Sequence, residues 1–177
     1  GIVTQVTLIP ELNLGIIVLT NQQSGAAFSA ITNTIKDSYL GIEPIDHIAD
    51  FSKKAKASEE KADKVTEEVW AAVAKNKKQK IDFQKYIGTY KDNWLGEVVI
   101  SEKKGKLYFA SKRSPQLSGE IFFYKDTNFV VKWDNRYFHA DAHIFFENNN
   151  SEFKMKPISP STDFSYDFQD LHFFKTQ

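Results

Sequence analysis

The distribution of aromatic residues constrains the fold of this chain more than any other feature of its sequence. Twenty-one of the 25 aromatic side chains lie in residues 81–177, and the exceptions are Phe28, Tyr39, Phe51 and Trp70. Within residues 81–177, apolar and polar positions alternate in short runs: GEVVIS, KLYFAS, GEIFFYK, NFVVKW, FHADAHIFF, EFKMKPI and FQDLHFFK. This period of two is typical of β-strands that have one packed face and one face in water.

Turn-forming residues separate these runs at short intervals. The breaks fall at Lys103–Gly105, Ser114–Pro115, Asp126–Asn128, Asn148–Asn150 and Ser159–Pro160. Such spacing predicts an antiparallel meander of seven or eight strands, curled into a barrel or a strongly bent sheet. We therefore expect residues 81–177 to form one β-barrel domain.

Residues 1–41 have a pattern that predicts a β-hairpin followed by a helix. Apolar and polar residues alternate over Ile2–Ile9, a turn is expected at Pro10–Asn13, and the continuously apolar GIIVLT that follows is typical of a strand covered on both faces. Ser24 is expected to cap the helix and Gly41 to end it in a left-handed conformation. Four larger side chains fall on one face of this helix: Phe28, Ile31, Ile35 and Tyr39.

Residues 42–80 predict a helical connector. Apolar and small residues recur at alternating steps of three and four, as in a heptad seam: Ile48, Phe51, Ala55, Ser58, Ala62, Val65, Val69 and Ala72. The small residues in the middle of this seam bury too little apolar surface to drive a strong coiled coil. The pattern is compatible with one long helix whose start is capped by Asp46, with two helices that break near Ser58, and with a dimerisation coil. Taken together, the three zones predict an α+β chain.

Composition excludes several classes of function. The chain has 23 basic and 23 acidic residues, so its net charge is zero and no global field attracts nucleic acid or anionic lipid. The lysine excess in residues 53–80 alternates with Glu and Ala, which is typical of a solvated helix. The absence of cysteine excludes disulfides and thiolate metal sites, and no apolar run is long enough for a membrane span.

No residue of the chain has the sequence context of a catalytic group. Three Ser-x-x-Lys tetrads begin at Ser58, Ser101 and Ser151. Ser101 and Ser151 are expected at strand ends or turns, where this spacing does not bring Ser and Lys together, and Ser58 is on a predicted helix with no group nearby to form an oxyanion hole. His139 and His143 have the spacing that binds zinc on a helix, but their segment is predicted to be a strand, in which His139, Asp141 and His143 would share one face. Four residues along a strand cover roughly 13 Å, too far for one ion. We expect no metal, no cofactor and no catalytic residue.

The aromatic excess allows two interpretations. A sheet of this size needs large side chains for its core, so most of the rings are expected to be structural. Curved sheets with aromatic interiors also bind small molecules, and the candidates for such a site are Trp94, Tyr108, Trp133 and Tyr137. This hypothesis places Trp94 and Trp133 on the wetter face of the sheet.

Two segments resemble known families. TQVTLIPELNLGIIVLTNQQSGAAFSAITNTIKDSYLG, from Thr4 to Gly41, closely resembles the C-terminal end of the class C β-lactamase-like serine hydrolases, which include penicillin-binding proteins, esterases and D-aminopeptidases. In that family, the terminal helix follows this strand segment and packs against the central sheet. From Ile81 the chain resembles a lipocalin-like β-domain of unassigned function that is often appended to those enzymes. YIGTYKDNWLGEVVISEKKGKLYF and DFSYDFQDL carry this second resemblance.

These resemblances imply a role without catalysis for the chain. The hydrolase family's Ser-x-x-Lys nucleophile, its Tyr-x-Asn and its Lys-Thr-Gly or His-x-Gly strand would lie upstream of Gly1, and none maps onto a residue here. We expect the C-terminal part of a periplasmic or extracellular serine hydrolase, with a β-barrel that modulates stability or substrate access. The catalytic domain of the same parent chain is then the expected partner.

Two further hypotheses remain open at this point. The barrel could be a binding module for cell-wall glycan, peptide or lipid. The chain could instead be a structural or dimerising element that uses the heptad seam. In either case, the hairpin is too small to be stable alone, and its free edge and apolar face would favour self-association or packing against the connector.

Overall fold

A computed structural model describes residues 2–176, and the chain divides into two compact units between Lys61 and Ala62. The first unit contains β1 (Val3–Ile9), β2 (Leu14–Thr20), α1 (Gly25–Leu40) and the first half of α2 (His47–Asn76). The second unit contains the rest of α2 and the strands β3 (Gly88–Asp92), β4 (Gly96–Lys103), β5 (Lys106–Ser111), β6 (Ser118–Lys125), β7 (Asn128–Trp133), β8 (Ala142–Glu147), β9 (Glu152–Pro157) and β10 (His172–Lys175). Short 3₁₀ turns cover Pro10–Leu12, Phe83–Lys85, Arg136–Phe138, Asn148–Asn150, Phe164–Tyr166 and Phe168–Asp170. The predicted α+β class is confirmed.

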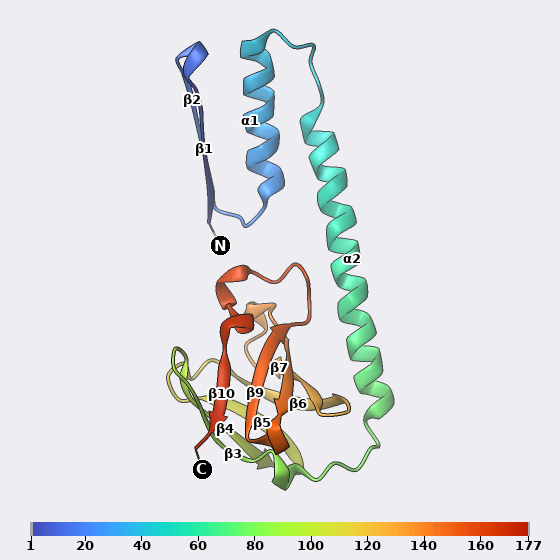
Figure 1. The fold of residues 1–177 in the computed structure, drawn as a ribbon. Coiled ribbons are helices and arrows are strands. Elements are labelled where there is room, and N and C mark those ends of the chain that lie inside the picture. Colours follow the sequence, from blue (N-terminus) through green and yellow to red (C-terminus); the bar gives the residue numbers. More distant parts are fainter. Residues whose placement is uncertain (1, 177) are drawn as a thin grey trace. The chain divides into compact units, whose positions relative to one another are not determined.

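The first unit is the predicted hairpin with a helix beside it (Figure 1). β1 and β2 pair antiparallel over their full length, from Val3 opposite Thr20 to Ile9 opposite Leu14. α1 packs on one face of the hairpin, where Ile16 and Val18 are buried. Ser24 occupies the N-cap position of α1, as predicted, but its side chain makes no capping hydrogen bond within the described residues.

Three further features define the end of α1 and the start of α2. Gly41 ends α1 in the left-handed region at φ +66°, as predicted. Asp46 accepts a hydrogen bond from the backbone nitrogen of Ala49 at 2.9 Å and so caps the start of α2. The imidazole Nε2 of His47 lies 2.6 Å from a carboxylate oxygen of the buried Asp37, which ties the start of α2 to the end of α1.

The prediction that β2 is covered on both faces is wrong for the described residues. Ile16 and Val18 face α1, but Ile17 and Leu19 on the opposite face are 68% and 74% exposed. On the predicted face of α1, Phe28 and Ile35 are partly buried, whereas Ile31 and Tyr39 are exposed. The fully buried residues of α1 are Ala30, Thr32 and Asp37.

α2 is one continuous helix, so the predicted alternative with a break near Ser58 is wrong. The heptad seam is only partly buried. Ala62 and Val69 are buried, whereas Ile48 at the start of the seam is 68% exposed. Val73, which the seam did not include, is buried as well.

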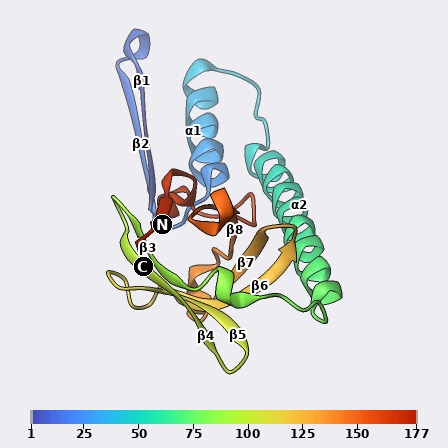
Figure 2. The same cartoon turned by 60° about the horizontal axis from the view of Figure 1, so that its bottom comes forward.

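The second unit is a closed antiparallel barrel with the strand order β10-β3-β4-β5-β6-β7-β8-β9. Every neighbouring pair is antiparallel, and β10 closes the barrel by pairing with both β3 and β9. Figure 2 shows the barrel from a second side, with β6 and β7 on the side nearest to α2. The predicted barrel of seven or eight strands is confirmed with eight.

Aromatic side chains fill the interior of the barrel. Phe153 stacks on Phe173 at a centroid distance of 4.5 Å, and Phe109 meets Trp133 edge-on at 5.3 Å. The Tyr90 hydroxyl lies within hydrogen-bond distance of the carbonyls of Tyr86, at 2.9 Å, and Asn150, at 3.1 Å. A barrel of this size has an interior just wide enough for side chains, so these rings form a packed core.

The second half of α2 covers the outer face of β6 and β7. Val69 and Val73 are buried against Val130 of β7 and Ile158. Trp70 meets Phe122 of β6 edge-on at a centroid distance of 5.6 Å. Lys132 places its ammonium group 5.4 Å from the centre of the Trp70 ring.

Two predicted strands are shorter than their sequence pattern. In FHADAHIFF, Arg136–Phe138 form a 3₁₀ turn, His139 is left-handed at φ +45°, and β8 begins only at Ala142. His139 and His143 therefore do not belong to one strand face. In FQDLHFFK, Phe168–Asp170 form a second 3₁₀ turn and β10 begins at His172. Alternation of aromatic and polar residues continues from the strands into these loops, which makes the strands look longer in the sequence.

Candidate functional site

The loops at the two ends of the barrel differ in length. Because successive strands run in opposite directions, alternate loops lie at the same end. One end has short connections: residues 104–105, 126–127 and 148–151. The other end, called here the long-loop end, has residues 93–95, 112–117, 134–141 and 158–171. Loops positioned by a rigid scaffold, and the mouths of barrels in particular, are common places for binding sites.

Asp92 organises the first loop of the long-loop end. One carboxylate oxygen of this buried residue accepts hydrogen bonds from the backbone nitrogens of Trp94 and Leu95, both at 2.7 Å. The other accepts a hydrogen bond from the backbone nitrogen of His172 at 3.0 Å. Gly96 follows at φ +83°, a conformation that favours glycine. The turn is therefore fixed at both sides.

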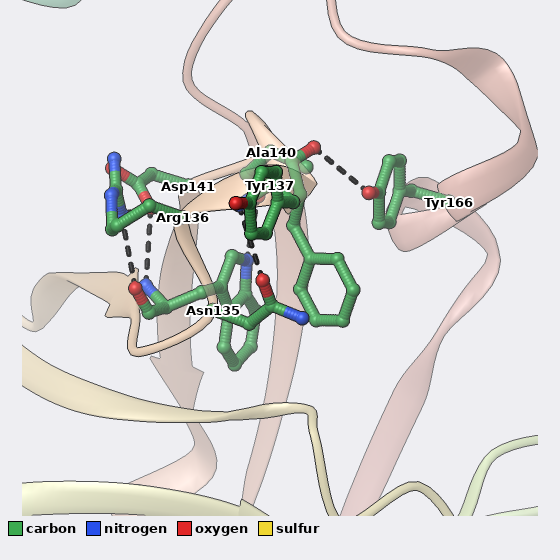
Figure 3. Close-up of polar contacts among 8 residues, drawn as sticks. Asn135, Arg136, Tyr137, Ala140, Asp141 and Tyr166 are labelled. Atoms are coloured by element: carbon green, nitrogen blue, oxygen red, sulfur yellow. Dashed lines mark hydrogen bonds and ion pairs between the residues drawn. The ribbon is translucent and has the colours of Figure 1, made fainter.

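Asp141 and Arg136 fix the loop of residues 134–141 (Figure 3). The guanidinium group of Arg136 donates to both carboxylate oxygens of Asp141, at 2.7 Å and 3.0 Å. Asp141 also accepts a hydrogen bond from the backbone nitrogen of Trp133 at 3.1 Å. This bidentate bond raises the pKa of Arg136 above its usual value.

The long loop of residues 158–171 folds over the barrel end through its aromatic side chains. The hydroxyl of Tyr166, which Figure 3 labels, donates to the carbonyl oxygen of Phe138 at 2.8 Å. Phe168 is buried and stacks between Tyr166, at 5.5 Å, and Trp133, at 6.0 Å. Burial raises the pKa of Tyr166, so this hydroxyl remains a donor at neutral pH.

A cavity of about 560 Å³ lies between three of these loops. Its walls come from Trp94 and Leu95, from Arg113 and Leu117, and from the 158–171 loop, including Tyr166 and Phe168. Among the described residues, no acidic side chain lines it, and most of its lining is apolar. A cavity of this size matches the sites that hold small organic molecules.

Arg113 is the one charged side chain that the described residues contribute to this lining. Its guanidinium Nη1 donates to the carbonyl oxygen of Trp94 at 2.6 Å. Within residues 2–176, no carboxylate forms an ion pair with Arg113, in contrast to the other arginine, Arg136. The neighbouring Lys112 is paired with Glu97 at 2.6 Å. The exposed Arg113 is therefore hydrogen-bonded to the Trp94 turn, and its other donors have no partner within residues 2–176.

A second depression, of about 550 Å³, lies between the end of α2 and strands β5 and β6. Its charged groups are largely engaged. Lys106 forms an ion pair with Glu120 at 2.8 Å, and Lys132 lies over the ring of Trp70. Lys77 also lines this depression and forms no ion pair within residues 2–176, so most but not all of its charged groups have partners.

The structure does not bring the four predicted ligand-binding residues together. Trp94 is 58% exposed and lines the cavity, as a binding residue would. Tyr108 lies on the outer face of β5, with the Lys103 ammonium 5.1 Å from its ring centre. Trp133 is 1% exposed and its indole donates to the carbonyl oxygen of Ala140 at 2.7 Å, so its placement on the wetter face was wrong. Tyr137 is 91% exposed and lies outside the cavity lining.

Sequence reasoning missed Asp92, Arg113, Tyr166 and Phe168. The signal for Asp92 was present in DNWLG, because Asp at the first position of a turn accepts hydrogen bonds from the backbone that follows. The part played by Arg113 has no such local signal, since its partner Trp94 lies in another loop.

The remaining polar groups do not form a reactive cluster. Within residues 2–176, no group of three or more His, Asp or Glu side chains is placed to hold a metal ion. Burial lowers the pKa of His143, whose ring lies between Tyr124 and Phe145. Among the described helices, none is long and apolar enough to cross a membrane.

Comparison with known proteins gives one match. No curated protein and no solved structure matches the chain. A family model described as "Domain of unknown function (DUF3471)" matches residues 72–175, from the last turn of α2 to the end of β10. The matched segment includes every strand of the barrel and all four loops of the long-loop end. Because it covers more than half of the sequence, the chain belongs to the DUF3471 family.

Proposed function

We propose that this chain is a non-catalytic part of a serine hydrolase of the β-lactamase-like type. In this proposal, residues 1–41 complete the catalytic domain's sheet, and the barrel is an accessory domain that modulates stability or substrate access. The reactive serine and its base lie in another part of the parent protein. The resemblance implies a periplasmic or extracellular location.

The observation that carries the proposal is the uncovered apolar face of the hairpin. Val6 and Ile17 are cross-strand partners, 62% and 68% exposed, and Leu8 and Leu19 continue the same face at 71% and 74%. Adjacent apolar side chains of this kind mark a surface that packs against protein. The opposite face is already packed against α1, so the hairpin has the composition of a strand pair inside a larger domain.

The resemblance suggests what covers this face. LIPELNLGIIVLTN followed by a helix is the arrangement at the end of the β-lactamase-like fold, in which the terminal helix packs against the central sheet. β1, β2 and α1 follow one another in this order, and α1 packs on one face of the two-stranded hairpin. The partner of the open face would then be the rest of that catalytic domain.

The position of the reactive serine can be tested by labelling with a serine-reactive fluorophosphonate. The reagent is applied to the longest natural polypeptide that contains this chain, and separately to residues 1–177. We expect one labelled serine in the natural polypeptide, outside residues 1–177, and no labelling of the isolated chain. A labelled serine within residues 1–177, or no labelled serine in either sample, would contradict the proposal.

The accessory role needs a second comparison. Ester and β-lactam hydrolysis are measured for the natural polypeptide with and without residues 81–177. We expect deletion of the barrel to change KM or to lower the melting temperature, because the barrel either borders the substrate path or supports the catalytic domain. Unchanged kinetics and an unchanged melting temperature would exclude both roles.

A further inference from the structure

We propose that the cavity at the long-loop end binds an organic carboxylate with an aromatic or aliphatic body. The proposal concerns residues of the barrel unit alone and goes beyond the accessory role. It rests on three properties of the cavity: its apolar lining, a cation without an ion pair within residues 2–176, and the hydrogen bonds that hold the backbone of the turn beside it.

The apolar part of the site would hold the body of the ligand. Leu95 and Leu117 line the cavity together with the buried Phe168. Trp94 is 58% exposed and contributes to the same lining, which leaves a large ring available for stacking. Burial of apolar ligand surface against such side chains supplies most of the affinity of small-molecule sites.

The charged part of the site selects an anion. Arg113 is the one ionised group in the described lining, and neither an acid in the cavity nor an ion pair within residues 2–176 neutralises it. Within residues 2–176, only its Nη1 is engaged, with the Trp94 carbonyl. A guanidinium group presents five donors in a planar fork, and a carboxylate is the acceptor whose geometry fits that fork.

Hydrogen bonds hold the backbone of the Trp94 turn and connect the Arg113 side chain to it. Asp92 fixes the Trp94 turn through two backbone hydrogen bonds, and the Arg113 side chain lies over Gly96 of the same turn. Tyr166 is fixed by its hydrogen bond to the carbonyl of Phe138. A preorganised site loses less conformational entropy when a ligand binds, so even a small ligand can be recognised.

The packed interior of the barrel is a less suitable site. Phe109, Phe153 and Phe173 are fully buried there and in contact with one another. A ligand could enter only by displacing core side chains. The cavity at the long-loop end requires no such rearrangement.

Matched acids and amides test the proposal. N-acetyl-L-phenylalanine and octanoate are titrated into the whole chain, and the neutral probes are N-acetyl-L-phenylalaninamide and octanamide. Binding is followed by the indole N–H signals of the three tryptophans in a ¹⁵N NMR spectrum. We expect saturable shifts of the Trp94 signal with the acids, about tenfold weaker binding of the amides, and no shift of the Trp70 signal.

Variants assign the selectivity to Arg113. Arg113→Gln should reduce the acid-to-amide affinity ratio from about tenfold to about one, and Arg113→Lys should give an intermediate ratio because it keeps the charge but loses the fork. Lys112→Gln removes the same charge from the neighbouring residue and should leave the ratio unchanged. Trp94→Ala should weaken acids and amides alike. The ratio is informative because a purely structural effect on the turn would weaken both probes equally.

A peptide pair tests whether the bound carboxylate can be the C-terminus of a peptide or only that of a small organic acid. Gly-Gly-Ala-Phe with a free C-terminal carboxylate is compared with its C-terminal amide. Selective binding of the peptide acid over its amide would extend the ligand class to peptide C-termini. Binding of N-acetyl-L-phenylalanine and octanoate alone would restrict the class to small organic acids. Equal affinity for acids and amides in the unmodified chain, or no saturable shift with any acid, would overturn the proposal.

Discussion

The carboxylate of Asp92 and the backbone nitrogen of His172 are 3.0 Å apart, so the last residue of β3 binds the first residue of β10. These two strands pair to close the barrel. The same carboxylate binds the backbone of Trp94 and Leu95. Asp92 therefore couples closure of the barrel to the shape of the turn that lines the cavity.

Removal of the Asp92 carboxylate should destabilise the barrel. Asp92→Ala leaves three backbone N–H groups without their acceptor, and we expect a loss of about 2–4 kcal/mol in the free energy of unfolding. All three tryptophans lie in the second unit, so urea unfolding followed by tryptophan fluorescence reports on that unit. Asp170→Ala, in the exposed part of the 158–171 loop, is the control and should change the free energy by less than about 0.5 kcal/mol. Equal effects of the two changes would contradict the role given to Asp92.

Gly119 is required where β6 approaches β7. A Cβ at this position would lie 2.2 Å from the carbonyl oxygen of Lys132 and 2.9 Å from the Cα of Trp133. Both are backbone atoms, so Gly119→Ala forces the strands apart, and we expect a loss of about 2–4 kcal/mol in the free energy of unfolding. Gly15→Ala is the control, because its Cβ meets only the side chain of Leu8 at 3.4 Å. An unchanged melting temperature in the Gly119→Ala variant would show that this close approach is wrong.

Trp133 and Trp94 should respond differently to the same substitution. Trp133→Phe leaves a void in the core and removes the donor to the Ala140 carbonyl, so we expect a loss of about 2–4 kcal/mol in stability. Trp94→Phe should cost less than about 1 kcal/mol, because Trp94 is largely exposed. Chemical denaturation of both variants measures the difference. Similar losses would mean that Trp94 also belongs to the core.

Titration of Tyr90 should lower the stability of the barrel in alkali. Burial, with a smaller contribution from Tyr86, raises the pKa of Tyr90 from 10.0 to about 12. The folded state thus keeps the proton at a pH where the unfolded state has lost it. The stabilisation is complete below pH 10.0 and is lost as pH rises towards about 12. The stability of the wild type minus that of Tyr90→Phe should therefore decrease over this range in urea unfolding experiments. A difference that stays constant or grows would show that Tyr90 titrates normally.

Much of the fold could be predicted because its information is local. Strand alternation and turn residues define the barrel strands from β4 to β9, and Ser24 and Gly41 mark the ends of α1. The two errors in strand length have a common origin. Phe138, Phe168 and similar residues continue the strand pattern, but their side chains anchor loops over the barrel end.

The candidate site could not be predicted in the same way, because tertiary contacts assemble it. Trp94 and Trp133 are both aromatic residues close to a turn, and nothing in their local sequence indicates that one is exposed and the other fully buried. Arg113 and Arg136 are likewise both in loops, yet only Arg136 finds a carboxylate, Asp141, within residues 2–176. Such differences arise from the closure of the barrel.

The most direct test of the account is the accessibility of the hairpin's open face. The chain has no cysteine, so Ile17→Cys introduces a single thiol on this face and Glu11→Cys introduces one at an exposed control position. Maleimide labelling, located by mass spectrometry, is timed in residues 1–177 and in the longest natural polypeptide that contains them. We predict that the thiol of Ile17→Cys reacts quickly in residues 1–177 and slowly in the natural polypeptide, while the control reacts quickly in both. Equally fast reaction at position 17 in both proteins would contradict the proposal that a catalytic domain covers this face.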